Sequence, residues 1–393
     1  MTEMIAVQVT PRAAARVRAG HPWVFASDVK DDGQAQPGQV VRVEVRHRGG
    51  GSNVLGRAFF NPRSLIRLRL IDRDGDAPDR AFWRARLRQA LALREALRTS
   101  DNALRLVYSE ADAVPGLVVD RYADVLSVQF LCAGTEALRE TFLDLLEELL
   151  HPRAIVERDD THGREMEGLP ERSGLVRGTL EGPVEIVEGG LRLRVDPRAG
   201  QKTGHYLDQR ENRQAAAAYA RGRCLDAFCY QGGFGLHLAR AGAEEVWLLD
   251  QSEEALRAAE AHAALNGLRV RTRAQNAFDA LRELHRAGEK FSVVVLDPPA
   301  FAKNRAALAG AVRGYKELNL RAMHLLEEGG TLVTSSCSYH MLPDRFEEVV
   351  QQAARDAGRR LQLLERRSAS RDHPERPGFP EARYLKCLIL RVL

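Results

Sequence analysis

Residues 224–250 read CLDAFCYQGGFGLHLARAGAEEVWLLD, and this stretch decides the fold of the C-terminal half. An apolar run is followed by a glycine-containing loop, a helical segment and a second apolar run that ends in Asp250. Gly232, Gly233 and Gly235 permit a ligand to approach the backbone closely at a helix N-terminus. A carboxylate at the end of the second strand can accept both ribose hydroxyls of a nucleotide. The stretch therefore predicts a strand–loop–helix–strand unit that binds a nucleotide-containing cofactor.

The nature of that cofactor is indicated by residues around the loop. The glycines do not form the G-x-G-x-x-G pattern, which weakens an NAD-dependent dehydrogenase as an interpretation. Asp226, on the first strand, instead favours a cofactor with a cationic amine, such as S-adenosylmethionine. Farther on, Asn276 and the following backbone can read an adenine edge while Phe278 packs nearby, although Asn276 is equally suited to cap a helix.

Outward from this unit, the sequence divides into three parts. From about residue 189 it alternates between strand and helix, which is typical of a mostly parallel sheet with helices on both faces. Residues 1–73 read as short strands with turns, including a turn at 49–52 and a helix at 11–19, and residues 74–188 mix helices and strands. We therefore expect a multidomain α/β protein with a β-rich domain (1–73), a central α+β domain (74–188) and a parallel-sheet domain (189–393). The strands expected in the last domain are 223–227, 245–250, 270–274, 291–296, 331–334 and 384–390, with 361–365 as a further candidate.

Composition excludes several classes of protein. No apolar stretch approaches the ~20 residues that cross a bilayer. The N-terminus lacks the apolar core of a signal peptide, so we expect a cytoplasmic protein with no membrane partner. The five cysteines are scattered and odd in number, which argues against a disulfide framework. None of them forms a C-x-x-C pair, so no metal site is expected.

The net charge of +4 is unevenly distributed. Residues 1–75 contain twelve Lys or Arg against seven Asp or Glu, so the rest of the chain is close to neutral. A basic block of this kind is typical of a module that binds a polyanion such as RNA. Arginine used for solubility would give the same count, and charge alone does not separate the two interpretations.

Two further strand ends carry residues suited to chemistry. The sequence DPPAF, at 297–301, follows an apolar run that its two prolines must end. The sequence SSCSY, at 335–339, ends the next apolar run. Ligands bind at the carboxyl ends of strands in open α/β sheets, so this edge can present the Asp297 carboxylate beside the Cys337 thiol. That pairing predicts covalent chemistry on a nucleobase.

Methylation at C5 of cytosine requires such a pair, because C5 is a poor nucleophile. A thiolate that adds to C6 activates C5 towards a methyl group, and a base then removes the C5 proton. Cys337 is the expected nucleophile and Asp297 the group that binds the pyrimidine edge, while the base is either Asp297 or a water. Cys229, in the glycine loop, is the second candidate thiol. We expect Phe301 to stack on a flipped base and Lys303 to bind a phosphate.

The polar segment AGQKTGHYLDQRENR, at 199–213, is too rich in charge for a simple linker. Lys202 or Arg210 is expected to neutralise the carboxylate of the cofactor or a substrate phosphate. The alternative is a solvated helix start with surface ion pairs. The glycine, threonine and aromatic residues among the charges favour a functional segment.

Together these motifs resemble the bacterial 23S ribosomal RNA cytosine-C5 methyltransferases that carry an N-terminal PUA domain. The resemblance covers essentially the whole chain and rests on GQKTGHYLDQRENR, DAFCYQGGFG, LDPPAFAK and SSCSYH, in that order. It implies a PUA-like barrel, a central α+β domain and a Rossmann-like class I domain dependent on S-adenosyl-L-methionine. The partner it implies is 23S ribosomal RNA. The oligomeric state stays open, with a homodimer among the options.

The resemblance also implies roles for individual residues, with Cys337 as nucleophile and Asp297 as its neighbour in the catalytic site. The implied cofactor pocket consists of Lys202, Tyr206, Asp208, Arg210, Asp226, Phe228, Gly232, Gly233, Asp250, Gln251, Ser252, Asn276, Ala277, Phe278 and Asp297. The implied substrate-binding residues are Pro298, Pro299, Phe301 and Lys303. The chain departs from related patterns in two ways: Asn276 stands where many methyltransferases have aspartate, and no second catalytic thiol is present to help release the adduct.

Two other functions remain open at this point. An acidic residue, two prolines and an aromatic residue also occur in enzymes that methylate a base nitrogen of guanine or adenine, for which no thiol is needed. A non-catalytic RNA-binding factor for ribosome assembly is the alternative from another class.

Overall fold

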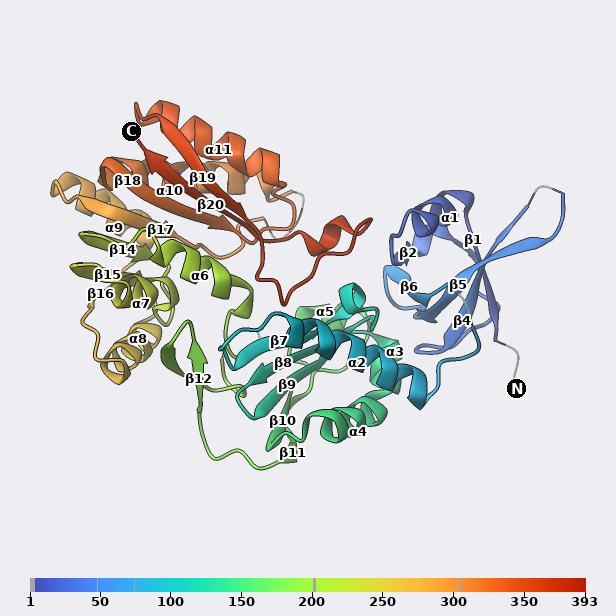
Figure 1. The fold of residues 1–393 in the computed structure, drawn as a ribbon. Coiled ribbons are helices and arrows are strands. Elements are labelled where there is room, and N and C mark those ends of the chain that lie inside the picture. The colour runs from blue at the N-terminus through green and yellow to red at the C-terminus, as the bar shows by residue number, and fades with distance from the viewer. Residues whose placement is uncertain (1–3, 48, 74, 201–202, 303, 305) are drawn as a thin grey trace. The chain divides into compact units, whose positions relative to one another are not determined.

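A computed structural model of the chain describes residues 4–47, 49–73, 75–200, 203–302, 304 and 306–393 (Figure 1). The chain divides into two compact units. The first consists of Met1–Ile186, Val195–Leu207 and Arg371–Ala382, and the second of Val187–Arg194, Asp208–Ser370 and Arg383–Leu393. Each unit is described separately.

The first unit begins with a six-stranded sheet in the order β2-β6-β5-β4-β1-β3. Its pairs are antiparallel except β1 with β4. Helix α1 (Pro11–Arg18) packs Ala13, Ala14 and Val17 into the apolar core of this sheet, as its sequence predicted. Ser52, which we expected in a turn, instead begins a long strand. The strands are β1 (Ala6–Val9), β2 (Trp23–Phe25), β3 (Val29–Asp31), β4 (Val40–Arg46), β5 (Ser52–Phe60) and β6 (Ile66–Asp72).

A second sheet of the first unit has the order β11-β10-β9-β8-β7. Its core contains Trp83, whose ring stacks on Phe59 at 5.6 Å and meets Phe142 edge-on at 5.3 Å. Two of its helices, α3 and α4, are separated by Leu138, whose backbone is not helical. The elements are α2 (Arg80–Ala96), β7 (Ala103–Tyr108), β8 (Leu117–Tyr122), β9 (Val125–Phe130), α3 (Ala133–Ala137), α4 (Arg139–Leu150), β10 (Ala154–Arg158), α5 (His162–Met166) and β11 (Ser173–Gly178).

Along the chain, β11 is followed by a two-stranded hairpin of β12 (Val184–Glu188) and β13 (Leu191–Val195). Its two turn residues, Gly189 and Gly190, have φ values of 53° and 78°. Left-handed backbone at both positions is what a tight hairpin turn requires, and glycine adopts it without strain. The sequence interpretation did not assign these two strands.

The second unit contains a seven-stranded sheet in the order β16-β15-β14-β17-β18-β20-β19. All neighbours are parallel except β20, which runs antiparallel to both β18 and β19. The expected strands are present, with shifts of a few residues at their ends. They are β14 (Arg223–Ala227), β15 (Glu245–Asp250), β16 (Arg271–Ala274), β17 (Phe291–Leu296), β18 (Leu326–Ser336), β19 (Leu361–Arg367) and β20 (Lys386–Val392).

Helices cover both faces of this sheet, as the alternating pattern predicted (Figure 1). Apolar residues of α9, α10 and α11 form one core with the strands, and those of α6, α7 and α8 form another. The helices are α6 (Arg210–Ala217), α7 (Gly233–Arg240), α8 (Glu253–Leu265), α9 (Ala277–Arg286), α10 (Leu308–Leu325) and α11 (Pro343–Asp356).

The strand order determines where a ligand can bind. From β14 the chain moves outward to β15 and β16 on one side, then returns to β17 and β18 on the other. The order therefore reverses between β14 and β17, and a crevice forms at their carboxyl ends.

None of the helices within the described ranges has the length and hydropathy needed to cross a membrane.

Candidate functional site

A buried carboxyl group lies at the reversal point of the sheet. Asp226, near the end of β14, is fully buried, and its Oδ2 accepts a hydrogen bond of 2.7 Å from the Gly235 backbone N–H. Its Oδ1 has no hydrogen-bond partner among the described residues. Burial raises the pKa of Asp226 to about 8, and the nearby charges of Asp297 and Asp250 add to the shift. A cationic ligand group placed here would stabilise the ionised carboxylate.

The loop after β14 has an unusual backbone. Phe228 and Tyr230 have φ values of 64° and 50°, a region that residues other than glycine rarely adopt. Strain of this kind is concentrated at ligand-binding sites. Gly232, with φ 83°, precedes the first turn of α7. A Cβ added at Gly235 would lie 2.2 Å from Leu248 Cδ2, so this glycine lets α7 pack directly on β15.

Asp250 is oriented by the backbone around it. Its Oδ2 accepts from Tyr230 N and its Oδ1 from Ser252 N, both at 2.9 Å. Each carboxylate oxygen keeps further acceptor capacity, which suits the two hydroxyls of a ribose. Ser252 itself caps α8, since its Oγ accepts from Ala255 N at 3.2 Å. Gln251, also predicted for the pocket, is exposed.

The residues that follow β16 show that Asn276 caps a helix, as one of its two interpretations predicted. Asn276 Oδ1 accepts from Phe278 N at 3.0 Å, which caps α9. Ala277 is buried at the first position of this helix. The Asn276 side-chain NH2 group is not used by this cap.

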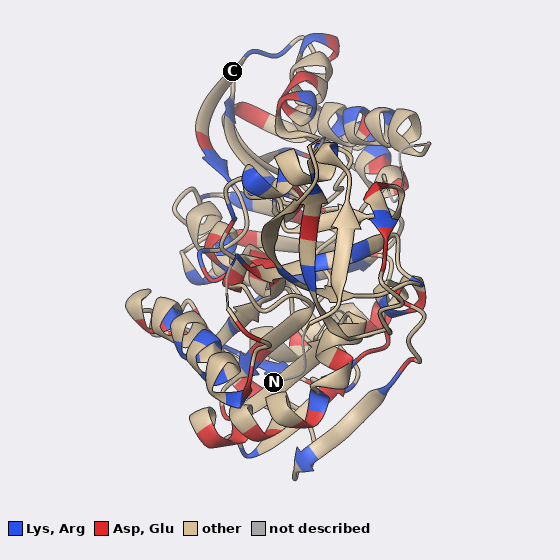
Figure 2. Cartoon of the chain, turned by 90° about the vertical axis from the view of Figure 1, so that its right-hand side faces the viewer, with Lys and Arg blue, Asp and Glu red and all other residues tan. Residues whose placement is uncertain are grey.

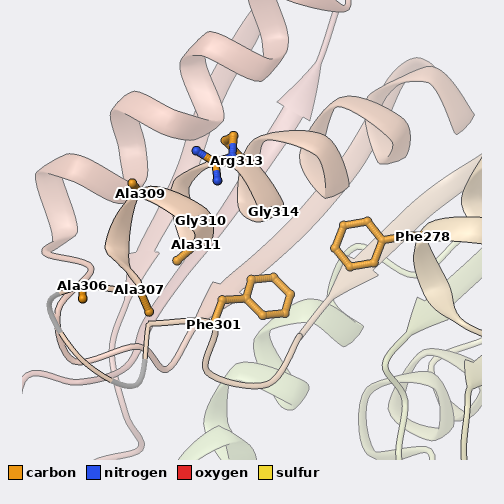
Figure 3. A pocket seen from close by; sticks show the side chains of 9 residues that line it. All are labelled: Phe278, Phe301, Ala306, Ala307, Ala309, Gly310, Ala311, Arg313 and Gly314. Atoms are coloured by element: carbon orange, nitrogen blue, oxygen red, sulfur yellow. The ribbon is translucent and has the colours of Figure 1, made fainter.

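An open cavity of about 590 Å³ adjoins the Phe278 ring. Figure 3 shows the Phe278 and Phe301 rings beside one another next to α10, and their centroids are 6.2 Å apart. Phe301 also packs against Tyr315 at 4.9 Å. The cavity is lined by Phe278, Phe301, Ala306, Ala307, Ala309, Gly310, Ala311, Arg313 and Gly314. Two aromatic rings among small residues and one cation form a surface suited to a flat, anionic ligand such as a nucleotide.

Residues at the start of α6 contact the strand ends. Gln209 Nε2 donates to Asp297 Oδ1 at 2.8 Å, and Tyr384 Oη donates to Asp208 Oδ2 at 2.6 Å. Arg210 is 1% exposed and lies 3.3 Å from Glu211, while Arg213 forms a two-pronged ion pair with Glu188 at 2.6 and 2.8 Å. The arginines are therefore buried, and the alternative of a solvated surface segment is wrong for them.

Three predicted residues cannot be placed with the others. Lys202 and Lys303 lie outside the described residues. Tyr206 is half-buried and belongs to the first unit, so its position is described only within that unit.

The two prolines after Asp297 differ in exposure: Pro298 is buried and Pro299 is exposed.

Cys337 lies directly after β18, next to the proline turn. Its Sγ lies 3.9 Å from the Pro298 carbonyl oxygen, and β17 and β18 are neighbouring parallel strands. The strand order thus brings the thiol to the turn that begins with Asp297. Cys337 is half-buried, whereas the other four cysteines are buried. Burial raises the pKa of Cys229 well above its usual value, which disfavours this second candidate as a nucleophile.

A hydrogen-bond network fixes the backbone on both sides of Cys337. Ser336 Oγ donates to Tyr315 Oη at 2.9 Å, and Ser338 Oγ lies 3.0 Å from the same oxygen. Ala302 N, in the loop after the prolines, donates to Ser338 Oγ at 3.1 Å. Tyr315 therefore links the cysteine segment to the proline loop.

Sequence reasoning gave no role to Gln209, Tyr315 or Tyr384. Gln209 and Asp297 are separated by 88 positions, and Tyr384 and Asp208 by 176. No local pattern encodes such pairs. The serines on both sides of Cys337 were the available signal for Tyr315, because buried hydroxyls need partners.

The basic block of the first unit is partly neutralised. Arg12 and Arg16 both pair with Asp28, at 2.8 and 2.6 Å, and Arg57 pairs with Asp72 at 2.6 Å. Figure 2 shows basic and acidic residues interleaved along the elements.

Within the described residues, no group of three or more His, Cys, Asp or Glu side chains could hold a metal ion.

Comparisons with known proteins agree with this geometry. A family described as S-adenosylmethionine-dependent methyltransferase matches residues 173–391, and a PUA-like domain family matches residues 7–73. A proposed SAM-dependent methyltransferase from Streptococcus mutans has the same fold, with a TM-score of 0.83 at 19% identity, over 99% of this chain and 100% of that one. The structure of SMU.776, a proposed methyltransferase complexed with SAH, gives a TM-score of 0.85 at 19% identity over the same shares of the two chains.

Other relatives share more of their sequence with this chain than these two solved structures do. The ribosomal RNA large subunit methyltransferase I of Tolumonas auensis is 43% identical over 95% of this chain and 96% of its own length. The protein of the same name from Shewanella amazonensis is 43% identical over 99% of both chains. The fold is thus a PUA-like domain, a central sheet domain and an α/β methyltransferase domain. The chain belongs to the S-adenosylmethionine-dependent methyltransferases and, within them, to the family of ribosomal RNA large subunit methyltransferase I.

Proposed function

We propose that this protein methylates C5 of a cytosine in 23S ribosomal RNA, with Cys337 as the covalent nucleophile. The observation that carries the proposal is the half-buried Cys337 thiol 3.9 Å from the Pro298 carbonyl oxygen, beside Asp297 at the ligand-binding edge of the sheet. The names of the relatives support large-subunit ribosomal RNA as the substrate class.

The residues at the reversal point fit S-adenosylmethionine. The Asp226 carboxyl, with one oxygen not hydrogen-bonded within the described residues, suits the cationic amine, and Asp250 suits the ribose hydroxyls. Phe228, Ala277 and Phe278 would border the adenine. When bound, S-adenosylmethionine supplies an electrophilic methyl group on a sulfonium.

The chain's own residues would act on the base as follows. The Cys337 thiolate forms a C–S bond to C6, and the π electron pair of the C5–C6 bond moves to C5, which then takes the methyl group. Asp297, oriented by Gln209, accepts a hydrogen bond from the exocyclic amine of cytosine. Asp297 or a water removes the C5 proton, and the C–S electron pair returns to sulfur as the double bond re-forms.

Cys337→Ala tests this proposal. We expect at least a 100-fold loss of 5-methylcytosine formation on ribosomal RNA, with less than a twofold change in S-adenosylmethionine affinity by calorimetry. Cys387→Ala, which removes a buried thiol from β20, is the matched control and should retain activity. Unchanged methyl transfer in Cys337→Ala would refute the thiol mechanism.

Mass spectrometry of the product nucleosides separates the remaining alternatives. The turn around Asp297 is also compatible with methylation of a base nitrogen, and N-methylated guanine or adenine as product would establish that function instead. If calorimetry found no S-adenosylmethionine binding at all, a non-catalytic assembly factor would be the better description.

A further inference from the structure

A lysine is buried behind the cysteine segment. Lys386 is the first residue of β20 and is 5% exposed. In the strand register it stands opposite Ser336, one position before Cys337. Its Nζ donates to the Ser338 carbonyl at 2.7 Å and to the Tyr384 carbonyl at 2.8 Å. The ammonium is therefore hydrogen-bonded to Ser338, the residue that immediately follows Cys337.

Burying this ammonium has a cost that its two hydrogen bonds do not remove. Both acceptors are neutral carbonyls, and no carboxylate pairs with Lys386 among the described ion pairs. Burial lowers the pKa of Lys386 to about 8, and the charge of Cys337 acts in the opposite direction. Two groups that influence each other's ionisation do so reciprocally, so the ammonium must favour the thiolate as much as the thiolate favours the ammonium.

Three other described side chains near the Cys337 segment supply no positive charge. Asp297 lies across the Pro298 turn, and its carboxylate disfavours a second negative charge. Tyr315, from α10, carries a pKa raised by burial and by Cys337, so it contributes a neutral hydroxyl. Tyr384 is hydrogen-bonded to Asp208, a further acidic group. Among these neighbours, Lys386 is the one that stabilises an anion on sulfur.

We propose that Lys386 is a positioning residue whose buried ammonium, held by the Ser338 and Tyr384 carbonyls, stabilises the thiolate of Cys337. This inference rests on the proposed function, in which that thiolate is the nucleophile. The competing explanation is purely structural: Lys386 would only attach the cysteine segment to β20. The two differ in one measurable property, the ionisation of the thiol.

The test measures the alkylation rate of Cys337 by iodoacetamide between pH 5.5 and 10, followed by mass spectrometry of the Cys337 peptide. In Lys386→Met we expect the midpoint of the rate curve to move up by about one pH unit, which is about a tenfold lower rate at pH 7. The rates should converge at high pH. Lys290→Met is the control. Lys290 also donates to a backbone carbonyl, that of His324 at 2.7 Å. It lies before β17, at the amino-terminal end of the strands and so away from Cys337. Its midpoint should equal that of the wild type.

An unchanged midpoint in Lys386→Met, with only the high-pH rate altered, would overturn the proposal and leave the structural explanation. Lys386→Arg keeps the charge and should restore part of the shift. If Lys386→Met fails to fold, the reciprocal measurement decides: carbon-13 NMR of labelled lysine should show a lower pKa for Lys386 in Cys337→Ala than in the wild type. Equal lysine pKa values in the two proteins would refute the proposal.

These measurements do not use methyl transfer, so they are independent of the proposed function. If Cys337→Ala remained active while Lys386→Met shifted the thiol midpoint, the thiolate would be stabilised but not catalytic. If Cys337→Ala were inactive while Lys386→Met left the midpoint unchanged, Cys337 would be the nucleophile without help from Lys386.

Discussion

At the scale of single residues, the site contains one acidic group, Asp226, whose ionisation is controlled by burial. Asp226 lies where water is excluded and two other carboxylates are near, and these conditions raise its pKa to about 8. Such a perturbed carboxyl in a crevice is typical of a ligand-binding position. Its ionisation has a consequence for stability that can be measured without ligand.

The pH dependence of stability follows from that shift. An aspartate in the unfolded chain releases its proton near pH 3.9, whereas the folded protein retains it on Asp226 until about pH 8. The stabilising contribution is therefore complete below pH 4 and is lost as the pH rises towards 8. In Asp226→Asn this loss disappears. We expect the melting temperature of the wild type to fall by several degrees relative to that of Asp226→Asn between pH 5 and pH 8, measured by calorimetry. Parallel curves would contradict the assigned pKa.

A second residue-scale prediction concerns Tyr315. Tyr315→Phe removes the hydroxyl that joins Ser336 and Ser338, and leaves two buried serines with fewer partners. We expect a loss of about 1–3 kcal/mol in the free energy of unfolding. Methyl transfer should fall about tenfold at unchanged S-adenosylmethionine affinity, because the Cys337 segment loses its fixed position. Normal activity would show that the network serves stability alone.

At the scale of elements, the strand–loop–helix–strand unit could be predicted in detail. The apolar runs of 224–227 and 245–250, the glycines between them and the final Asp250 are local signals, and β14, α7 and β15 follow them closely. The hairpin of β12 and β13 and the strand β5 were not predicted. In β5 a glycine–serine stretch conceals the strand start, and in the hairpin each strand is only five residues long.

The glycine pattern gives a prediction at this scale. Gly235→Ala would place a Cβ 2.2 Å from Leu248 Cδ2 and push α7 away from β15, so we expect a destabilisation of about 1–3 kcal/mol. Gly310, in α10, is the matched control: the nearest atom to an added Cβ is the end of the Arg313 side chain at 4.0 Å. Gly310→Ala should stabilise the helix by up to about 1 kcal/mol. Denaturant unfolding of both variants checks the contrast.

At the scale of the whole molecule, composition and alternation predicted a β-rich N-terminal part and a parallel-sheet C-terminal part. The contacts that complete the site could not be predicted, because they join residues far apart in the chain: Gln209 with Asp297, and Lys386 with Ser338. The count of basic residues also overstated the free charge of the first unit, since arginines such as Arg16 have buried carboxylate partners there. The net excess of positive charge nevertheless remains.

That excess leads to a prediction about RNA binding. Phosphate contacts release counterions, so the affinity of the protein for ribosomal RNA should fall linearly with the salt concentration on a double logarithmic plot. Arg46, exposed at the end of β4, forms no ion pair in the described part of the chain and is a candidate for such a contact. Arg46→Gln should lower the slope by about one phosphate contact. Arg153→Gln is the control, because Arg153 is already paired with Asp124 at 2.8 Å, and its slope should match the wild type. An affinity independent of salt would show that the basic block does not bind the RNA backbone.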